Sequence, residues 1–154
     1  MNIAFFLKPK HEVAFLYEDQ SLRQGLEKMR HHGYAAIPVI TRESKYIGTV
    51  SEGDFLRYLL HEEGRRLSST TMRELEDVTI CQALLPHAAK NPAVRITQTA
   101  EELLFQAMNQ NFIPVVDDFD SFIGIVTRKD ILSYFYREMM RRPQEMPGLQ
   151  SQAF

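Results

Sequence analysis

Cysteine is almost absent from this sequence. Cys81 is the single cysteine among 154 residues, so no disulfide can form within the chain, and a zinc site built on several cysteines is excluded. Cys81 lies in a mostly apolar segment, residues 80–85. Because unpaired cysteine is among the most buried residue types, its side chain is expected to be buried.

Long apolar runs and a strong net charge are also lacking. The apolar run at residues 3–7 is shorter than the roughly 7–15 residues of a signal-peptide core, and no run approaches the roughly 20 residues of a membrane span. The formal net charge of -2 gives no broad attraction to nucleic acid or to an anionic membrane. We therefore expect a cytoplasmic protein that binds neither nucleic acid nor membrane.

Signatures of catalysis and of metal binding are scarce. The chain has no Gly-x-Gly-x-x-Gly fingerprint, no Gly-Lys-Ser/Thr phosphate loop and no recognisable nucleophile elbow. No two histidines have the i, i+4 spacing of a helical metal site. The sequence predicts a protein that is not an enzyme and that needs no metal or cofactor. A small nucleotide-hydrolysing or nucleotide-transferring enzyme stays an alternative that lacks an obvious base or nucleophile.

One segment of the chain occurs twice, in residues 46–54 and 122–130. Each copy is an apolar run containing a glycine, which ends at Ser51 or Thr127 and is followed three residues later by Asp54 or Asp130. The copies are 76 positions apart and align without a gap. The composition, 44% apolar and 25% charged, is that of a folded globular protein.

Each copy predicts the order strand, helix, strand, strand, helix. A unit of this size buries too little surface to be stable alone, so the two copies are expected to pack around a pseudo-twofold axis. Clefts at such a seam commonly bind small ligands. The elements are expected at residues 13–17, 22–32, 34–40, 46–50 and from Ser51 onward, and again at 93–96, 100–108, 112–116, 122–126 and 130–142.

The proposed division is residues 1–66 for the first repeat, 67–78 for a connector, 79–142 for the second repeat and 143–154 for a loose tail. Thr71 and Glu74 have capping-box spacing, which predicts a short helix in the connector. Pro38 lies inside a predicted strand and cannot donate to a ladder, which predicts an edge strand or an irregularity there.

These segments resemble the CBS-domain pair, also called the Bateman module. The resemblance is carried by residues 36–39 with 48–54 and by residues 112–115 with 124–130, and it extends over most of the chain. It implies an α+β fold of two CBS repeats around a pseudo-twofold axis, like that of small stand-alone bacterial members. It also implies a regulatory sensor that binds AMP, ADP, ATP or cyclic di-AMP between the repeats and signals to a partner protein.

The site residues follow from this resemblance and from helix-terminus chemistry. The start of a helix favours phosphate because its backbone N–H groups are free there. The ribose is expected on Asp54 and Asp130, and the phosphate on Ser51, Thr127 and Arg128. The adenine walls are Tyr34, Ala35, Ala36, Ile37 and Pro38 in one repeat and Phe112, Ile113 and Pro114 in the other. Ser21, Thr97 and Thr99 are placed near the adenine edge, and Lys129 and His32 near a phosphate.

The same Ser/Thr-x-x-Asp spacing is also that of a capping box, so capping alone is the alternative explanation. The two copies differ between the hydroxyl and the carboxylate. The second has Arg128 and Lys129, whereas the first has Glu52 and Gly53. Since arginine pairs with phosphate and glutamate repels it, the Asp130 cleft is predicted to be the better phosphate site.

The final helix of each repeat carries more apolar residues than one core needs. This surplus predicts a homodimer formed through these helices. The alternative function is therefore a ligand-free interaction or dimerisation module that uses the same surface.

Overall fold

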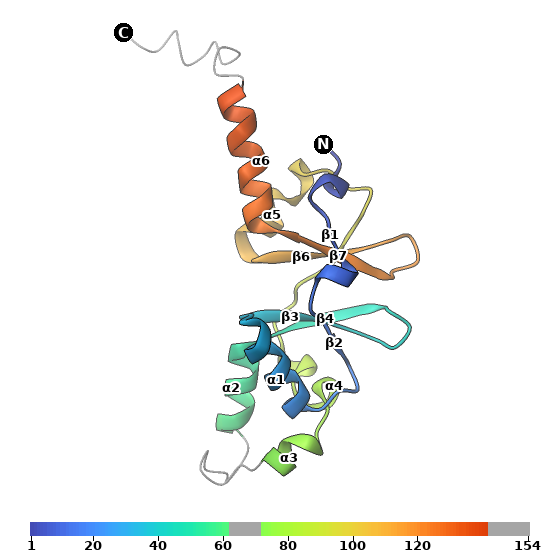
Figure 1. The fold of residues 1–154 in the computed structure, drawn as a ribbon, viewed down its shortest axis with the longest axis vertical. Coiled ribbons are helices and arrows are strands. Elements are labelled where there is room, and N and C mark those ends of the chain that lie inside the picture. The colour runs from blue at the N-terminus through green and yellow to red at the C-terminus, as the bar shows by residue number, and fades with distance from the viewer. Residues whose placement is uncertain (62–71, 142–154) are drawn as a thin grey trace, which may run out of the picture.

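A computed structural model describes residues 1–61 and 72–141 of the protein. Two halves are stacked along the long axis of the molecule, with their sheets side by side in the middle (Figure 1). The last helix of each half points away from the seam between the sheets. This α+β architecture of two similar halves confirms the fold class predicted from the repeat. The predicted tail and Thr71 lie outside the described residues.

The first half is a three-stranded sheet with two principal helices, and its elements follow the predicted order. They are β2 (Leu16–Tyr17), α1 (Leu22–His32), β3 (Ala36–Ile40), β4 (Tyr46–Ser51) and α2 (Glu52–His61). The strand order is β2-β3-β4, with β2 parallel to β3 and β3 antiparallel to β4. Both helices lie on the side of the sheet that faces away from the other half (Figure 1).

The second half repeats this arrangement. Its elements are β5 (Val94–Arg95), η5 (Glu101–Leu103), α5 (Leu104–Asn109), β6 (Phe112–Val116), β7 (Phe122–Thr127) and α6 (Arg128–Arg141). A fourth strand, β1 (Lys8–Pro9), pairs antiparallel with β7, so the sheet order is β1-β7-β6-β5. The remaining short elements are η1 (Ile3–Phe6), η2 (Lys10–Glu12), α3 (Met72–Glu76), α4 (Ile80–Ala83) and η4 (Leu85–His87).

Helix α1 has the bounds that the sequence predicts. Ser21 accepts a hydrogen bond from the backbone N–H of Gln24, and the Gln24 side chain accepts one from the backbone of Ser21. This reciprocal pair satisfies N–H groups that have no partner within the helix. The helix ends at Gly33, which has φ of 68°, a left-handed conformation that glycine adopts without a steric penalty.

The corresponding helix of the second half differs from the prediction. It begins as the 3-10 turn η5, and α5 covers six residues only. Its starting residue, Ala100, has no side chain that can cap, unlike Ser21 in the first half. Met108 belongs to the predicted apolar stripe but is 75% exposed.

The prediction of an edge strand at Pro38 is wrong, because β3 is the middle strand of its sheet. Strand β2 pairs only with Val39 and Ile40. The carbonyl of Ile40 points toward β2 and accepts from the N–H of Glu18, so the nitrogen of Pro38 points to the same side, beyond the paired residues. Pro38 itself pairs in register with Thr49, and the register shifts only between Val39 and Ile40, so the irregularity lies beyond the proline.

The start of each repeat packs on the other half. Ile3 of η1 is fully buried in the second core, and Ile80 of α4 is fully buried in the first. The backbone contacts correspond: Leu22 N–H donates to Val78 at 2.9 Å, and Ala100 N–H donates to Met1 at 2.9 Å. The predicted division at residues 1–66 and 79–142 assigns Ile3 to the first repeat and Ile80 to the second, whereas each is buried in the core of the other half.

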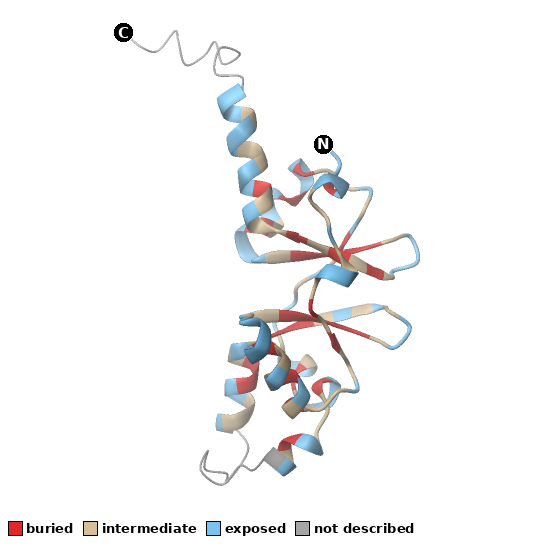
Figure 2. Cartoon of the chain, in the orientation of Figure 1, coloured by how far each residue is buried: buried red, intermediate tan, exposed pale blue. Residues whose placement is uncertain are grey.

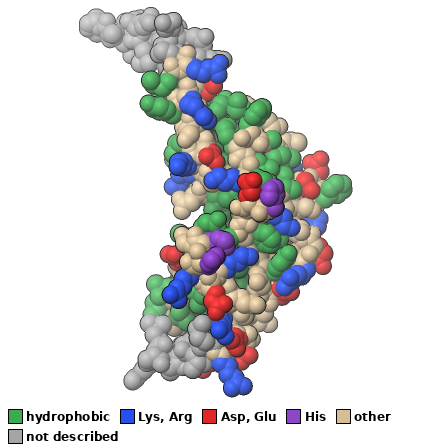
Figure 3. Space-filling view, viewed as in Figure 1, with side chains coloured by type: hydrophobic (Ala, Val, Ile, Leu, Met, Phe, Trp, Pro, Cys, Tyr) green, Lys and Arg blue, Asp and Glu red, His purple; other side chains and the backbone are tan. Residues whose placement is uncertain are grey.

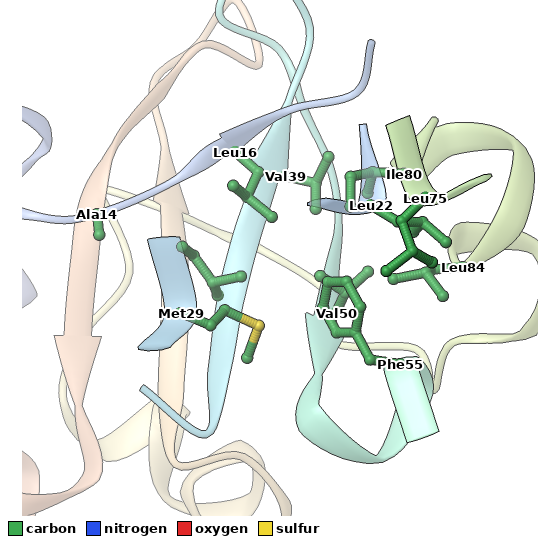
Figure 4. Close-up of a cluster of buried hydrophobic side chains, with 11 residues drawn as sticks. Ala14, Leu16, Leu22, Met29, Val39, Val50, Phe55, Leu75, Ile80 and Leu84 are labelled. Carbon is green, nitrogen blue, oxygen red and sulfur yellow. The ribbon is translucent and has the colours of Figure 1, made fainter. Parts of the chain in front are cut away.

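Each half has its own apolar core, and buried positions concentrate on the sheets and on the inward faces of the helices (Figure 2). In the first core, Leu16, Val39 and Val50 come from the sheet, and Phe55 and Ile80 pack on them from the helices (Figure 4). Because α4 supplies Ile80, this core is incomplete without the segment that follows the connector.

The expectation of a buried Cys81 is wrong, because its side chain is exposed. Helix α4 begins at the Thr79 cap and directs Ile80 into the core. In a helix the next residue lies about 100° around the axis, which places Cys81 on the outer side.

The hairpin loops join the two halves at one end of the seam. Phe122 N–H donates to the carbonyl of Ser44 at 2.7 Å, and Lys45 forms a bridge with Ser121. Between the sheets, the fully buried ring of Phe122 stacks on Tyr46 at 6.4 Å. Among the described residues, none of the helices combines the length and apolarity that crossing a membrane would require.

Candidate functional site

A cleft of about 290 Å³ lies between the two halves. The first repeat lines it with Tyr34, Ala36 and Pro38, and the second with Phe112 and Thr127. These five belong to the residues predicted from the sequence. The structure therefore brings one predicted adenine wall together with the predicted phosphate hydroxyl of the other repeat. The cleft is completed by Lys8, Glu12, Val13, Ala14, Asn111 and Ile125.

The remaining wall residues are placed differently. The side chains of Ile37 and Ile113 are fully buried in the two cores, so only their backbone can approach a ligand. Ala35 is exposed, and its carbonyl accepts from the N–H of Glu52. Pro114 is buried in β6.

Asp130 lies in the first turn of α6. Thr127 Oγ1 accepts a hydrogen bond from the backbone N–H of Asp130 at 3.2 Å. The half-buried Asp130 side chain has no hydrogen-bond or ion-pair partner among the described residues. A carboxylate in this state can accept hydrogen bonds from donors on a ligand, such as hydroxyl groups.

Arg128 does not face a phosphate site in this structure. Its Nε donates to the carbonyl of Ala107 at 2.6 Å, and its Nη2 lies 3.4 Å from the carbonyl of Met108. These carbonyls end α5, where a cation is favoured by the helix dipole. The prediction that Arg128 binds phosphate is therefore not supported by its position, and the neighbouring Lys129 is exposed.

At the start of α2, Ser51 and Asp54 form hydrogen bonds with each other. Asp54 accepts from the backbone N–H of Ser51 at 2.8 Å and from the Ser51 hydroxyl at 3.1 Å. Ser51 Oγ accepts in return from the N–H of Asp54 at 3.2 Å, and Arg57 pairs with the same carboxylate. Only 6% of Asp54 is exposed. The capping alternative therefore describes the first repeat well.

The residues predicted at the adenine edge lie away from the cleft. Ser21 caps α1 and lines an outer groove with Thr79. Thr99 forms a bridge with Asn2, and Thr97 is exposed. His32, in contrast, stacks on the cleft residue Tyr34 with a centroid distance of 5.4 Å and an interplanar angle of 24°.

A second cavity, of about 490 Å³, lies on the outer side of the first repeat. Asp54, Arg57, Tyr58 and His87 are among its lining residues. The Asp54–Arg57 pair thus faces this cavity. In the described part of the chain, no three His, Cys, Asp or Glu side chains are grouped as a metal site would require.

The family model described as CBS domain matches the chain twice, at residues 6–61 and 87–137, which together make up more than half of its length. The chain belongs to the CBS-domain family. The tandem pair predicted from the two Gly-to-Asp motifs is thereby confirmed.

The chain is similar in sequence to one curated protein and in fold to several solved structures, at low sequence identity. An uncharacterized protein of Methanocaldococcus jannaschii is 27% identical over 140 aligned positions, covering 76% of this chain and 82% of that protein. The solved structure of CbpB in complex with c-di-AMP has a TM-score of 0.77 and 24% identity, covering 94% of this chain and 91% of that one. CBSX2 in complex with AMP has a TM-score of 0.66 and 22% identity, covering 88% and 96%.

The cleft residues that sequence reasoning missed come mainly from the N-terminal segment, notably Lys8, Glu12 and Ala14. A signal for this segment exists in the sequence. Asn2-Ile3 and Thr79-Ile80 are 77 positions apart, and in each pair a capping residue precedes an isoleucine. These two pairs hold equivalent places before the first strand of each repeat.

Proposed function

We propose that this CBS pair is a regulatory sensor that binds an adenosine-containing nucleotide, of the AMP, ADP, ATP or cyclic di-AMP class, in the cleft between its repeats. The observation that carries the proposal is the cleft itself, which joins Tyr34, Ala36 and Pro38 of one repeat to Thr127 of the other. The apolar side accepts a base, and the polar side accepts ribose and phosphate.

The chemistry of the second repeat suits a nucleotide. The ribose of AMP, ADP or ATP presents two neighbouring hydroxyl groups, and each ribose of cyclic di-AMP presents one. The Asp130 carboxylate, which has no partner among the described residues, can accept hydrogen bonds from them. The start of α6 offers the Thr127 hydroxyl and a helix dipole that favours phosphate. CbpB and CBSX2, which share the fold, are described in complex with c-di-AMP and AMP respectively.

The first repeat would contribute the base wall and not a second equal site. Ser51 and Asp54 satisfy each other, and Arg57 pairs with the carboxylate. Binding there would have to displace these contacts. We therefore assign the nucleotide site to the start of α6, where Asp130 would bind the ribose and Thr127 the phosphate. Arg128 would not contact the phosphate.

The proposed regulation is a shift between two states that bind the nucleotide with different affinity, with occupancy passed to a partner protein. The chain would act as a binding module, not as an enzyme. No cofactor is required in this mechanism, because the nucleotide is itself the regulatory signal.

The test is a thermal-shift screen of the full chain against AMP, ADP, ATP, cyclic di-AMP, NAD and S-adenosylmethionine. A ligand that binds only the folded state, present at about 100 times its dissociation constant, stabilises it by about 2.7 kcal/mol, which is readily visible. We expect one nucleotide to raise the melting temperature and to lose this effect in Asp130→Ala. An unchanged melting temperature with all six ligands would contradict the sensor function.

The second candidate function is a dimerisation or interaction module, and a specific surface favours it. Exposed apolar side chains follow the outer faces of α5 and α6, whereas α1 carries Glu27 and Arg30 at the corresponding positions. This surface consists of Leu104, Phe105, Met108, Leu132, Tyr136, Met139 and Met140. Such a patch on a small protein marks an interaction site.

We propose that a second copy of the chain covers this surface. Light scattering after size exclusion should give a dimer for the unmodified chain and a monomer for Leu132→Lys. Leu56→Lys, the equivalent change on α2 of the first repeat, is the matched control and should perturb the dimer less. A monomeric unmodified chain would exclude the homodimer and leave a different protein as the partner.

A further inference from the structure

The outer edge of β4 is open, whereas the outer edge of β7 is paired. On β7, Ile125 lies opposite Lys8 and Gly124 lies opposite Pro9, so β1 extends that sheet. In the described part of the chain, β4 pairs with β3 alone. A groove of about 600 Å³ lies between β4 and the segment of residues 85–93. The two sheets thus differ by one strand at equivalent edges.

Thr49 has on β4 the place that Ile125 has on β7. Successive residues of an antiparallel ladder direct their backbone groups alternately toward and away from the neighbouring strand. Thr49 lies opposite Pro38, whose nitrogen points toward β2, so the N–H and C=O of Thr49 point to the open edge. Neither group has a hydrogen-bond partner among the described residues, although only 4% of Thr49 is exposed. Such buried backbone groups cost free energy, which a further strand would relieve.

A segment equivalent to β1 already lies at this edge. Leu85-Pro86 follows Lys8-Pro9 by 77 positions, the offset that also relates the starts of the two repeats. The segment forms the 3-10 turn η4 instead of a strand, and the Leu85 side chain approaches Gly48. A residue that precedes proline favours an extended conformation, and proline is tolerated in edge strands such as β1. The segment is therefore suited to both conformations.

We propose that Leu85-Pro86 is a switch segment, which can leave η4 and pair antiparallel with β4 as β1 pairs with β7. Leu85 would exchange two backbone hydrogen bonds with Thr49, and Pro86 would lie opposite Gly48. The paired state would fill the groove along β4 and give the first sheet a fourth strand.

The two states are close in the number of hydrogen bonds. In the unpaired state, which the structure shows, the N–H groups of His87 and Ala88 donate to the carbonyls of Leu84 and Leu85 at 3.1 and 3.3 Å. Pairing exchanges these two bonds for two bonds at Thr49. Because neither state gains a large excess of bonds, both can be populated.

Glycine at position 48 is needed by the paired state and not by the unpaired one. In the existing pair, Gly124 has φ of 153°, and a Cβ there would collide with the carbonyl of Lys8. Gly48 has no positive φ in the unpaired state, and a Cβ would meet only the flexible end of the Leu85 side chain. Pairing would require Gly48 to adopt the conformation of Gly124, which residues with a Cβ rarely adopt.

The segment is held at both ends, so only its middle has to move. Ile80 is fully buried in the first core, and the Tyr46 hydroxyl donates to the carbonyl of Asn91 at 2.5 Å. His87 would move with the switch, and it lines the outer cavity together with Asp54. A molecule that binds one of the two forms more tightly would therefore shift the balance between them.

A strand from another protein is not needed to fill this edge. Among the described residues that line the groove, Lys90 alone is charged. Acidic and basic side chains are interspersed on the face shown in Figure 3, without a broad region of one sign that would attract a charged peptide. Leu85-Pro86 needs no such attraction, because the chain holds it beside β4 at a high effective concentration.

The test compares His87→Pro with His87→Ala in the full chain. Proline at this position removes an N–H that closes η4 and disfavours a helical conformation of the preceding residue, so it should favour pairing. His87→Ala is the matched control, because it removes the same side chain and keeps the N–H. Two NMR readouts report the strand: amide hydrogen exchange at Thr49, corrected for intrinsic rates, and an NOE between the Hα atoms of Gly48 and Pro86. Opposite residues of this kind approach to about 4.5 Å between Cα atoms.

In His87→Pro, exchange at Thr49 should slow about tenfold or more, and the Hα NOE should appear. His87→Ala should leave both readouts as in the unmodified chain. Adding Gly48→Ala to His87→Pro should reverse the slowing. In the unmodified chain, relaxation dispersion at Thr49 should detect the minor paired state on the μs–ms timescale, and Gly48→Ala should remove it.

Four outcomes would overturn the switch. They are unchanged exchange at Thr49 in His87→Pro, slowing that survives Gly48→Ala, an unmodified chain without dispersion at Thr49, and protection that rises with protein concentration. The last would show that a second copy pairs with β4. If His87→Pro does not fold, the dispersion of the unmodified chain and of Gly48→Ala decides alone. Each outcome is independent of nucleotide binding, so the sensor function is tested separately.

Discussion

The two repeats begin their final helices with the same motif, yet they leave its aspartate in opposite states. Asp54 is buried and bonded to Ser51 and Arg57, whereas Asp130 has no side-chain partner among the described residues. The residue 76 positions after Arg57 is Ser133, whose side chain is too short to make the same ion pair. In both repeats the hydroxyl accepts a hydrogen bond from the N–H of the aspartate, so the two motifs differ only in what the carboxylate contacts.

A second difference lies in how the segment that crosses from the other half packs on each sheet. This segment contains β1 for the second repeat and Leu85 for the first. In the second repeat, β1 runs against β7 and adds a strand to the sheet. In the first, the side chain of Leu85 approaches β4 at Gly48, and residues 84–93, all in the described part of the chain, form no strand. The cleft is therefore built on the side where residues of the N-terminal segment pass between the sheets.

Gly124→Ala should destabilise the protein much more than Gly48→Ala. Gly124 has φ of 153°, and a Cβ there would collide with the backbone carbonyl of Lys8 in the neighbouring strand. At Gly48 a Cβ meets only the flexible end of the Leu85 side chain, at 2.9 Å. We expect a loss of about 3 kcal/mol or more against about 1 kcal/mol, measured by urea unfolding. Equal losses would show that β1 is not held closely on β7.

Asp130→Ala should weaken nucleotide binding about 10- to 100-fold, because a charged hydrogen-bond acceptor is lost. Asp54→Ala should weaken it less than about threefold, since Asp54 is already occupied by Ser51 and Arg57. Calorimetry with the ligand identified by the thermal-shift screen measures both. A larger loss for the Asp54 variant would reverse the assignment of the site.

The stability of the same two variants should show the opposite order. Asp54→Ala removes a buried acceptor of three hydrogen bonds and leaves Arg57 without its partner. We expect a loss of about 1–3 kcal/mol in the free energy of unfolding. Asp130→Ala removes no bond made by its carboxylate and should cost less than about 1 kcal/mol. Equal costs would indicate that Asp130 also supports the fold.

The smallest expected effect concerns pH and the paired positions Tyr46 and Phe122. Burial raises the pKa of Tyr46 to about 12, opposed by a hydrogen bond with Thr49. Because the folded state holds this proton more tightly than the unfolded chain, the stabilisation is complete below about pH 10 and is lost between about pH 10 and pH 12.

Urea unfolding at pH 9, 10 and 11 compares the unmodified chain with Tyr46→Phe, which places the residue of the second repeat in the first. The variant loses the hydrogen bond from the Tyr46 hydroxyl to the carbonyl of Asn91. It should therefore be less stable near pH 9, and its disadvantage should shrink as the pH rises. A difference that stays constant over this range would show that Tyr46 ionises as freely as in the unfolded chain.

Local chemistry made much of the fold predictable. The bounds of α1 follow from the capping residues Ser21 and Gln24 and from the closing glycine, Gly33. The paired hairpins follow from two apolar runs separated by short polar loops. The short α5 was less predictable. Neither Ala100, which precedes η5, nor Leu103, which precedes α5, caps with its side chain, and the apolar pattern there resembles that of a longer helix.

The candidate site was predictable only in part. The sequence pointed to Tyr34, Ala36 and Pro38 on one repeat and to Thr127 on the other, and the structure brings them into one cleft. Arg128 was assigned to phosphate from its neighbours in sequence, but its guanidinium reaches the carbonyls at the end of α5. A long side chain can donate to carbonyl groups that are distant in sequence, and the local sequence does not specify which of these lie within reach.

The sequence by itself determined that the chain is a doubled unit with an aspartate at the start of each final helix. Repetition and local capping are properties of residues close together in the chain. Only the tertiary structure decided that the start of each repeat crosses to the other half. It also decided that the Asp54 carboxylate bonds to Ser51 and Arg57, whereas the Asp130 carboxylate has no partner among the described residues. These features depend on contacts between distant segments, whose free energy appears only when the two halves pack together.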